Sequence, residues 1–282
     1  MHTSSKDDLR LTVLTVNYNS APFICFMLDA LEKLTFFSYE VIICDNGSAT
    51  SDLTLLKDAV INRDNVCIFY RQQTKKGSVG HGEALDFISS KVKTDYFAVI
   101  DADAAFLMKD WDRILIERLT NTIKAIGTQA AGGKVQDFPV AYGIIFETAA
   151  FRRLRCIFSP LKGDLLDSDH DVGWIIREKF HAAGLTGEVL ELKITRDWKN
   201  GPFRELICGE FYLKGIDHIF ASHFGRGSTL GAAKRIGIWT RIPVLRRIIA
   251  FRVGVRERDL WIQTAQQIVN AQLGALKKTN LQ

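Results

Sequence analysis

Short apolar runs alternate with longer segments of helical period along the first hundred residues of the chain. A run of five or six apolar residues predicts a buried strand, and apolar residues three or four positions apart predict a helix with one buried face. Alternating strands and helices are typical of βαβ units, which build a largely parallel sheet. We expect strands at residues 11–16, 40–44, 66–70 and 96–100, and helices at residues 22–34, 51–61 and 82–92.

The pattern is less regular after residue 103, where glycine-containing loops separate the apolar segments. This second half is expected to be mixed rather than a further series of βαβ units. We predict helices at residues 111–123 and 169–183, and strands at residues 125–128, 141–146 and 189–195. Together these elements predict an α/β protein whose first half has a Rossmann-like, mainly parallel sheet.

The composition is that of an ordinary soluble globular protein, with 282 residues of which 47% are hydrophobic and 24% charged. The five cysteines are scattered without the spacing of a metal site, which favours a reducing compartment. The first eight residues have no apolar core of a signal peptide, and no apolar segment is long enough to cross a bilayer. We therefore expect a cytoplasmic protein.

The net charge of +5 is distributed unevenly. Residues 226 to 258 contain nine arginines and lysines and a single acidic residue, Glu257, so the basic character belongs to the C-terminal part. Residues 244–252 alternate apolar pairs with arginines at helical spacing. Such a helix could lie in the headgroup layer of an anionic membrane, or dock on the core with its arginines in solvent. A nucleic-acid partner is not expected, because no recognisable nucleic-acid module accompanies this segment.

Two aspartates, Asp101 and Asp103, follow the apolar run of residues 96–100. In an open α/β sheet, ligands bind where the strands emerge. Hard cations such as Mg²⁺ and Mn²⁺ take oxygen ligands and link one or two carboxylates to the phosphates of a substrate. Because side chains two apart on a strand face the same way, both carboxylates could reach one ligand. A solvated turn is the alternative explanation of the triplet.

The order and spacing of several motifs resemble those of the family 2 glycosyltransferases, inverting enzymes with the GT-A fold. LTVLTVNYNS (residues 11–20) is similar to the family's opening strand and turn, and YEVIICDNGSATSD (residues 39–52) to its second strand. GHGEALDFISSKVKTDYFAVIDADAAF (residues 80–106) is similar to the stretch that leads to the family's metal-binding Asp-x-Asp. A weaker resemblance continues through AYGIIFETAAFRRL, DHDVGWIIREKFHAAG and SHFGRGS, to about residue 228.

The resemblance implies a site for the nucleoside of a sugar donor at the ends of the first two strands. A carboxylate there can accept hydrogen bonds from a uracil N–H or a ribose hydroxyl. The same residue types form turns and helix caps, so a structural role is the alternative. Exposed N–H groups near the two glycines that begin the third helix would suit an anionic or polar ligand. The implied donor-binding residues are Thr15, Asn17, Tyr18, Asp45, Gly80, Gly82 and Asp101.

For the metal, the resemblance implies Asp103 as a direct ligand of Mn²⁺ or Mg²⁺ at the donor's diphosphate, with Asp101 nearer the ribose. Such a cation stabilises the charge that develops as the nucleoside diphosphate leaves. His223 matches the family's His-Gly-Ser loop and is the implied third ligand, since imidazole is acceptable to Mn²⁺. His218 lies close by as a competitor, and a structural or surface role is the alternative for a lone histidine.

An acceptor hydroxyl must lose a proton as it attacks the anomeric carbon, and an ionised carboxylate can take that proton. In the family this residue is the Asp of a Glu-Asp pair at a helix start. The matching pair here is His170-Asp171, which implies Asp171 as the base and departs from the pattern at His170. Asp167 and Asp169 are alternative bases. Asp171 also fits a Ser-x-x-acid capping box with Ser168, so an architectural role is a further explanation.

These observations predict a metal-dependent inverting glycosyltransferase, free in the cytoplasm or peripheral on the inner membrane face. Its donor is expected to be a sugar linked to UDP, GDP or dTDP, and its acceptor a hydroxyl of a lipid-linked saccharide or surface-glycan precursor. A metal-dependent nucleotidyltransferase and a noncatalytic nucleotide-sugar-binding module remain open. We assign the donor to residues 1–106, the acceptor and the base to residues 107–228, and a basic amphipathic helical extension to residues 229–282.

Overall fold

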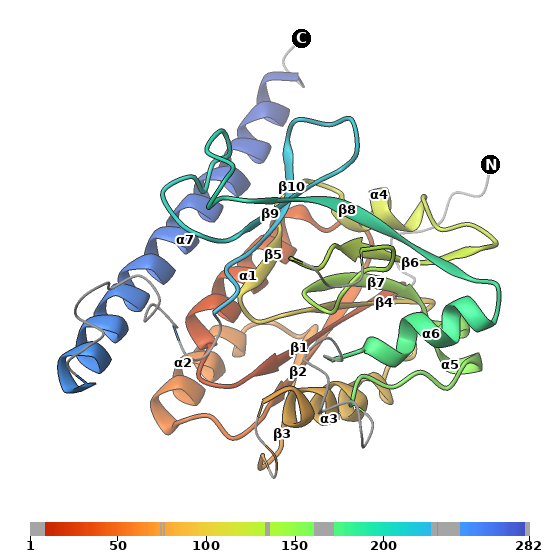
Figure 1. Ribbon diagram of the computed structural model, residues 1–282, viewed down its shortest axis with the longest axis horizontal. Coiled ribbons are helices and arrows are strands. Elements are labelled where there is room, and N and C mark those ends of the chain that lie inside the picture. Colours follow the sequence, from red (N-terminus) through yellow and green to blue (C-terminus); the bar gives the residue numbers. More distant parts are fainter. Residues whose placement is uncertain are drawn as a thin grey trace.

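The computed structural model describes residues 9–73, 75, 77–132, 136–160, 172–226, 230 and 243–279, and in the last range the side chains of residues 249 and 251–274. Within these ranges strands and helices alternate as far as β4, and the order is irregular after it (Figure 1). The strands are β1 (Leu11–Asn17), β2 (Tyr39–Asp45), β3 (Val66–Tyr70), β4 (Tyr96–Ile100), β5 (Ala104–Phe106), β6 (Ile123–Thr128), β7 (Gly143–Glu147), β8 (Thr186–Ile194), β9 (Gly209–Tyr212) and β10 (Ile219–His223). The helices are α1 (Ala21–Leu34), α2 (Thr50–Val60), α3 (Gly77–Ser89), α4 (Trp111–Ile116), α5 (Thr148–Arg153), α6 (Trp174–Ala182) and α7 (Pro243–Thr279).

The strands form one sheet in the order β3-β2-β1-β4-β7-β6-β8-β9-β10-β5. The first four in this order are parallel, which confirms the predicted parallel half. Strand β1 is buried along its whole length, as expected for a strand covered on both faces. Beyond β4 the sheet is mixed, because β7 runs antiparallel to both β4 and β6, and β9, β10 and β5 continue in antiparallel pairs.

Helices cover both faces of this sheet (Figure 1). One core combines apolar residues of α1, α4 and α7, and the other those of α3, α5 and α6. In α1, residues Phe23, Met27, Leu31 and Leu34 recur at helical spacing and are each at most 3% exposed. The predicted helix at residues 22–34 is confirmed, because its apolar stripe has a sheet to pack on.

A tight turn connects β4 to β5. The N–H of Ala104 donates to the carbonyl of Asp101 at 2.9 Å, and β5 begins at once. Strand β5 pairs antiparallel with β10, so that His223 lies opposite Ala104. This pairing brings the end of β10 beside the aspartate turn. The apolar pattern does not predict β5, β9 or β10, because runs of three to five residues carry no clear period.

The helix expected at residues 111–123 is shorter in the structure. Helix α4 ends at Ile116, and β6 begins at Ile123. Between them the hydroxyl of Thr120 accepts hydrogen bonds from the N–H groups of Thr122 and Ile123, at 3.3 and 3.0 Å. A threonine hydroxyl that binds nearby backbone in this way stabilises a turn at the expense of the helix.

The helix expected from residue 169 also begins later, at Trp174. Its N-cap residue, Gly173, has a φ of 78°, a left-handed conformation through which a right-handed helix does not continue. The N-cap of α6 is thus Gly173, and the predicted capping box of Ser168 and Asp171 lies outside the described residues. Residues 161–171, which include Asp171 and the alternative bases Asp167 and Asp169, lie outside the described residues.

Helix α7 lies along α1 at one side of the molecule (Figure 1). Trp261, Ala265 and Val269, spaced four residues apart, are fully buried. The indole of Trp261 packs among four rings at centroid distances of 5.7 to 6.4 Å, those of Phe23, Phe26, Phe203 and Phe224. Over residues 251–274 the C-terminal segment is thus a helix docked on the core.

The more basic end of α7 is only partly described. Phe251 is 61% exposed, and Arg252 and Arg256 are exposed. The side chains of Arg246 and Arg247 lie outside the described residues. Among the helices that the structure describes, none has both the length and the apolar character needed to cross a membrane.

Candidate metal and donor site

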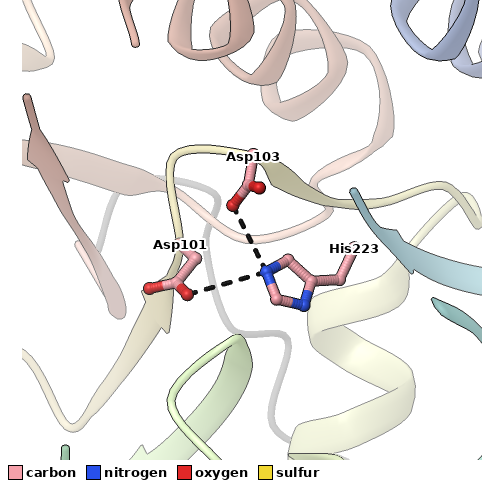
Figure 2. Close-up of side chains that lie close together, drawn as sticks. All are labelled: Asp101, Asp103 and His223. Carbon is pink, nitrogen blue, oxygen red and sulfur yellow. Dashed lines mark ion pairs between the residues drawn. The ribbon is translucent and has the colours of Figure 1, made fainter. Parts of the chain in front are cut away.

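Two carboxylates and one imidazole converge beyond the end of β4. Asp101 and Asp103 lie in the turn between β4 and β5, and His223 is the last residue of β10 (Figure 2). Nε2 of His223 lies 3.3 Å from Oδ1 of Asp103 and 3.8 Å from Oδ2 of Asp101. One ligand atom from each residue can be chosen so that all three lie within 4.8 Å of one another. The exposed His218, on the loop before β10, is not part of this group.

The loop after β10 holds Asp103 in place. The Asp103 side chain is 6% exposed, and its Oδ2 accepts a hydrogen bond of 2.8 Å from the N–H of Arg226. The N–H of Phe224 donates to the carbonyl of Asp103, also at 2.8 Å. One carboxylate oxygen is therefore fixed by backbone, while the other faces His223.

Tyr142 supports the imidazole of His223 from the side. The two rings stack with centroids 4.2 Å apart and an interplanar angle of 28°. The carbonyl of Tyr142 also accepts the N–H of Asp101 at 3.0 Å. Tyr142 thus orients the imidazole of His223 with its ring and fixes the backbone of Asp101 with its carbonyl. Nothing in the apolar pattern of the sequence indicates this role.

Opposing effects act on the pKa of His223. Burial lowers it, but the carboxylates of Asp103 and Asp101 raise it by more, so the pKa lies above its ordinary value. Without a metal, the two carboxylates thus favour the protonated imidazole more than water does. A cation bound there would replace that proton, because only a neutral imidazole can act as a ligand.

The arrangement fits Mn²⁺ or Mg²⁺. A Mg²⁺ ion binds oxygen at about 2.1 Å with octahedral geometry, which places neighbouring ligand atoms about 3 Å apart. The separations of 3.3 and 3.8 Å at Nε2 of His223 are close to that spacing. Two carboxylates with one imidazole form a donor set that Mn²⁺ accepts. The predicted ligands Asp103 and His223 are thus brought together, with Asp101 beside them.

The predicted donor residues of the first two strands form a buried network. Asn17 and Asp45 lie side by side at the ends of β1 and β2. Nδ2 of Asn17 donates to Oδ1 of Asp45 at 2.9 Å and also lies within 3.0 Å of oxygens of Ser48 and Asp52. Asp45 in turn accepts two bonds of 3.3 Å from the N–H groups of Gly47 and Ser48. These contacts agree with the alternative role of this segment as a turn.

Among the predicted donor residues at the ends of β1 and β2, Tyr18 has the accessible side chain. It is 40% exposed, whereas Thr15 and Asn17 are fully buried and Asp45 is 4% exposed. Thr15 and Asn17 therefore shape the end of β1 from within the core. Tyr18 is placed where a flat nucleobase could contact it.

The two glycines of α3 permit close packing. A Cβ on Gly80 would lie 2.0 Å from the carbonyl oxygen of Lys75, and one on Gly82 would lie 2.7 Å from Cα of Ser159. Helix α3 begins at Gly77, earlier than predicted, so the N–H of Gly82 belongs to the helical ladder rather than to its open end. The expectation of exposed N–H groups there is wrong for Gly82.

His81, between these glycines, contacts the metal group. Its Nε2 lies 3.3 Å from Oδ1 of Asp101. A cavity of ≈ 260 Å³ opens beside this pair, and its described walls are mainly apolar and aromatic, with Tyr142 and Trp174 among them. Val172, next to Asp171 in sequence, also lines the cavity. The only sequence signal for His81 is its position between two glycines in the segment that precedes the aspartates.

Comparisons with known proteins identify the family and the fold. The family model described as glycosyl transferase family 2 matches residues 12–161. The mannosyltransferase PcManGT from Pyrobaculum calidifontis, solved with GDP-Man and Mn²⁺, is 15% identical with a TM-score of 0.52, and the alignment covers 98% of this chain and 81% of that chain. No curated protein gives a significant match.

Two further solved structures align with a smaller part of the chain. Glucosyl-3-phosphoglycerate synthase from Mycobacterium tuberculosis, in complex with Mn²⁺, UDP and phosphoglyceric acid, is 16% identical with a TM-score of 0.47, covering 65% of this chain and 68% of that chain. S. aureus TarS is 17% identical with a TM-score of 0.47, covering 64% of this chain and 35% of that chain.

The likeness to the mannosyltransferase extends over nearly the whole chain and shows the GT-A fold, an α/β fold with a mixed open sheet. The family model covers just over half of the 282 residues, from β1 through the aspartate turn to the segment beyond α5. The family match supports a role in glycosyl transfer. The chain therefore belongs to glycosyl transferase family 2.

Proposed function

We propose that this protein transfers a sugar from a nucleoside diphosphate donor to a hydroxyl acceptor with inversion at the anomeric carbon. The convergence of Asp101, Asp103 and His223 at the end of β4 carries the proposal. It lies at the carboxyl edge of the parallel strands, where ligands of open α/β sheets bind. UDP-, GDP- and dTDP-linked sugars are the candidate donors.

Asp103 and His223 would hold Mn²⁺ or Mg²⁺, with Asp101 toward the ribose. When bound, the cation offsets the negative charge of the departing nucleoside diphosphate. The backbone N–H of Arg226 keeps the Asp103 carboxylate aimed at the site. Tyr18 would contact the base of the donor at the end of β1. In this assignment residues 1–106 bind the donor and residues 107–228 supply the acceptor site and the base.

A panel of nucleoside diphosphate sugars, with and without Mn²⁺, tests the donor class by thermal shift. A ligand that binds only the folded state adds about 2.7 kcal/mol to the free energy of unfolding at 100 times its Kd. We expect one donor to stabilise the protein in a Mn²⁺-dependent way. If every donor leaves the melting temperature unchanged in the presence of Mn²⁺, the proposed function is wrong.

Product analysis separates the two other function classes. A nucleotidyltransferase would release diphosphate from a nucleoside triphosphate, whereas a glycosyltransferase releases a nucleoside diphosphate from its sugar donor. A noncatalytic binding module would give a donor-dependent thermal shift and no donor hydrolysis with Mn²⁺.

We expect Asp171→Asn to lower kcat by about 100- to 10,000-fold, the range for loss of a general base. The amide cannot take the proton of the acceptor hydroxyl, while donor binding should persist because the diphosphate contacts are untouched. Turnover and the donor-dependent thermal shift are the two measurements. Asp167→Asn and Asp169→Asn are the matched variants, and near-normal turnover of Asp171→Asn would assign the base elsewhere.

The acceptor is proposed to be a lipid-linked saccharide or surface-glycan precursor, for synthesis of a polysaccharide at the inner membrane face. The mainly apolar described walls of the cavity beside Asp101 suit an acceptor that carries an apolar group. The exposed Phe251, Arg252 and Arg256 of α7 suit an anionic headgroup layer. Flotation with liposomes of anionic and of neutral lipid tests this partner, and absence of the protein from the floated anionic fraction would refute it.

A further inference from the structure

A chain of contacts links helix α7 to the carboxylate of Asp103. Glu257 of α7 forms an ion pair with the guanidinium of Arg226. The same guanidinium lies over the ring of Phe224, with Cζ 3.9 Å from the ring centroid. The backbone N–H of Arg226 donates to Oδ2 of Asp103 at 2.8 Å. The loop that orients Asp103 is therefore anchored at its far side by an acidic residue of α7.

A second contact joins α7 to the strand that carries His223. Nε1 of Trp261 donates to Oγ of Ser222 at 2.9 Å, one residue before His223. The hydroxyl of Ser222 donates to the carbonyl of Gly209 on the neighbouring strand at 3.0 Å. Glu257 and Trp261 are four residues apart and so lie on one face of the helix. This face therefore contacts the chain both before His223, at Ser222, and after it, at Arg226.

We propose that helix α7 is part of the metal site and that Glu257 is a positioning residue for Asp103, acting through Arg226. The inference rests on the proposed function, since it assumes that Asp103 and His223 bind a divalent cation. It extends the site to a helix that lies beyond the matched family region of residues 12–161.

The physical reason is the shielding of the ion pair. The side chains of Arg226 and Glu257 are 11% and 15% exposed, so their attraction is screened less than that of a surface pair. Loss of Glu257 removes this anion from a largely buried guanidinium, which is destabilising, and we expect the side chain to shift in response. Because the side chain and the N–H belong to the same residue, that movement pulls the hydrogen-bond donor away from Asp103. Residues that orient metal ligands typically contribute 10- to 100-fold to metal affinity.

Glu257→Gln tests the inference through the affinity for Mn²⁺, measured by the electron paramagnetic resonance signal of free Mn²⁺ at a fixed UDP concentration. We expect the variant to bind Mn²⁺ about 10-fold more weakly than the wild type. Asp259→Asn is the matched control, since it removes the same charge from the same helix at a side chain that is 59% exposed and paired with Arg258. It should bind Mn²⁺ like the wild type.

A second control separates positioning from a general loosening of α7. Val269→Ala removes buried apolar volume from the same helix without touching Arg226. It should lower the melting temperature and leave the Mn²⁺ affinity unchanged. Equal losses of affinity in Val269→Ala and Glu257→Gln would overturn the assignment of Glu257.

Two measurements keep the inference distinct from the proposed function. In an Arg226→Gln background, Glu257→Gln should cause no further loss of Mn²⁺ affinity, because the pair acts as one unit. Amide hydrogen exchange at Arg226, measured without metal, should be faster in Glu257→Gln than in Asp259→Asn. If the wild type binds no Mn²⁺ with UDP, the proposed function and this inference fall together. If the wild type binds and Glu257→Gln binds equally well, the inference alone is wrong.

Discussion

Asp103→Asn will abolish Mn²⁺-dependent binding of the donor and lower turnover by at least about 100-fold, since a catalytic metal supplies several kcal/mol to the transition state and each 1.4 kcal/mol is a factor of ten. The amide keeps the shape of the carboxylate, and its oxygen can still accept the N–H of Arg226. Only the negative charge toward His223 is removed. The fold should therefore persist while the metal site is lost.

The measurements for this variant are the Mn²⁺-dependent thermal shift with UDP and the rate of nucleoside diphosphate release. Asp110→Asn is the matched control, because it removes the same charge at a residue outside the group. Asp110 has a φ of 58°, a conformation in which asparagine is as well tolerated as aspartate. Retention of Mn²⁺-dependent turnover by Asp103→Asn would show that the proposed metal site is misplaced.

Trp261→Ala will lower the free energy of unfolding by about 3–5 kcal/mol, the usual cost of truncating a large buried aromatic side chain. Trp261 is fully buried among the rings of Phe23, Phe26 and Phe224, and its truncation leaves a cavity between α7 and α1. The hydrogen bond from Nε1 of Trp261 to the hydroxyl of Ser222 is lost as well. Urea unfolding of the variant and the wild type measures the difference.

Leu260→Ala provides the comparison for Trp261. Leu260 is the preceding residue of the same helix and is 36% exposed, so its truncation should change stability by no more than about 0.5 kcal/mol. Trp261→Phe retains an aromatic ring and removes the hydrogen bond to Ser222, at a cost of about 1 kcal/mol for that bond alone. A stability of Trp261→Ala within the error of the wild type would mean that α7 is not docked as described.

The parallel half of the protein follows closely from the sequence. Strands β3 and β4 have the predicted bounds, and β1 and β2 differ from theirs by a residue or two at their ends. Strand β1 and most of β2 and β4 are buried, so they are largely apolar runs bounded by polar turns. Strand β3 lies at the edge of the sheet and is only partly buried. The position of Asp101 and Asp103 at the exit of β4 follows from the same pattern, because the apolar run ends at Ile100.

The mixed half is less predictable for a physical reason. Helix α4 stops early where the hydroxyl of Thr120 binds the backbone, and α6 starts late after the left-handed Gly173. Both boundaries depend on local hydrogen bonds and dihedral angles that apolar periodicity does not contain. Strands of three to five residues such as β5 depend on partners elsewhere in the chain.

The candidate ligands are predicted from the sequence, but the pairing of β5 with β10 brings them together. His223 follows from a resemblance to the family's His-Gly-Ser loop, and only the β5–β10 register places it opposite Ala104 and beside Asp103. The supporting residues Tyr142, Arg226 and Glu257 have no sequence signal of this role. Each acts through a contact across the fold rather than through a motif.

The amino-acid sequence alone indicates the family, the α/β class, the parallel strands and the carboxylates at the end of β4. Each of these depends on residues that are neighbours along the chain. The tertiary structure alone decided that Asn17 serves as a buried link between turns, that His81 reaches Asp101, and that α7 holds the loop around Asp103. These features join residues far apart in the chain. Their positions depend on which faces of the sheet and helices pack together, and local sequence patterns do not specify that packing.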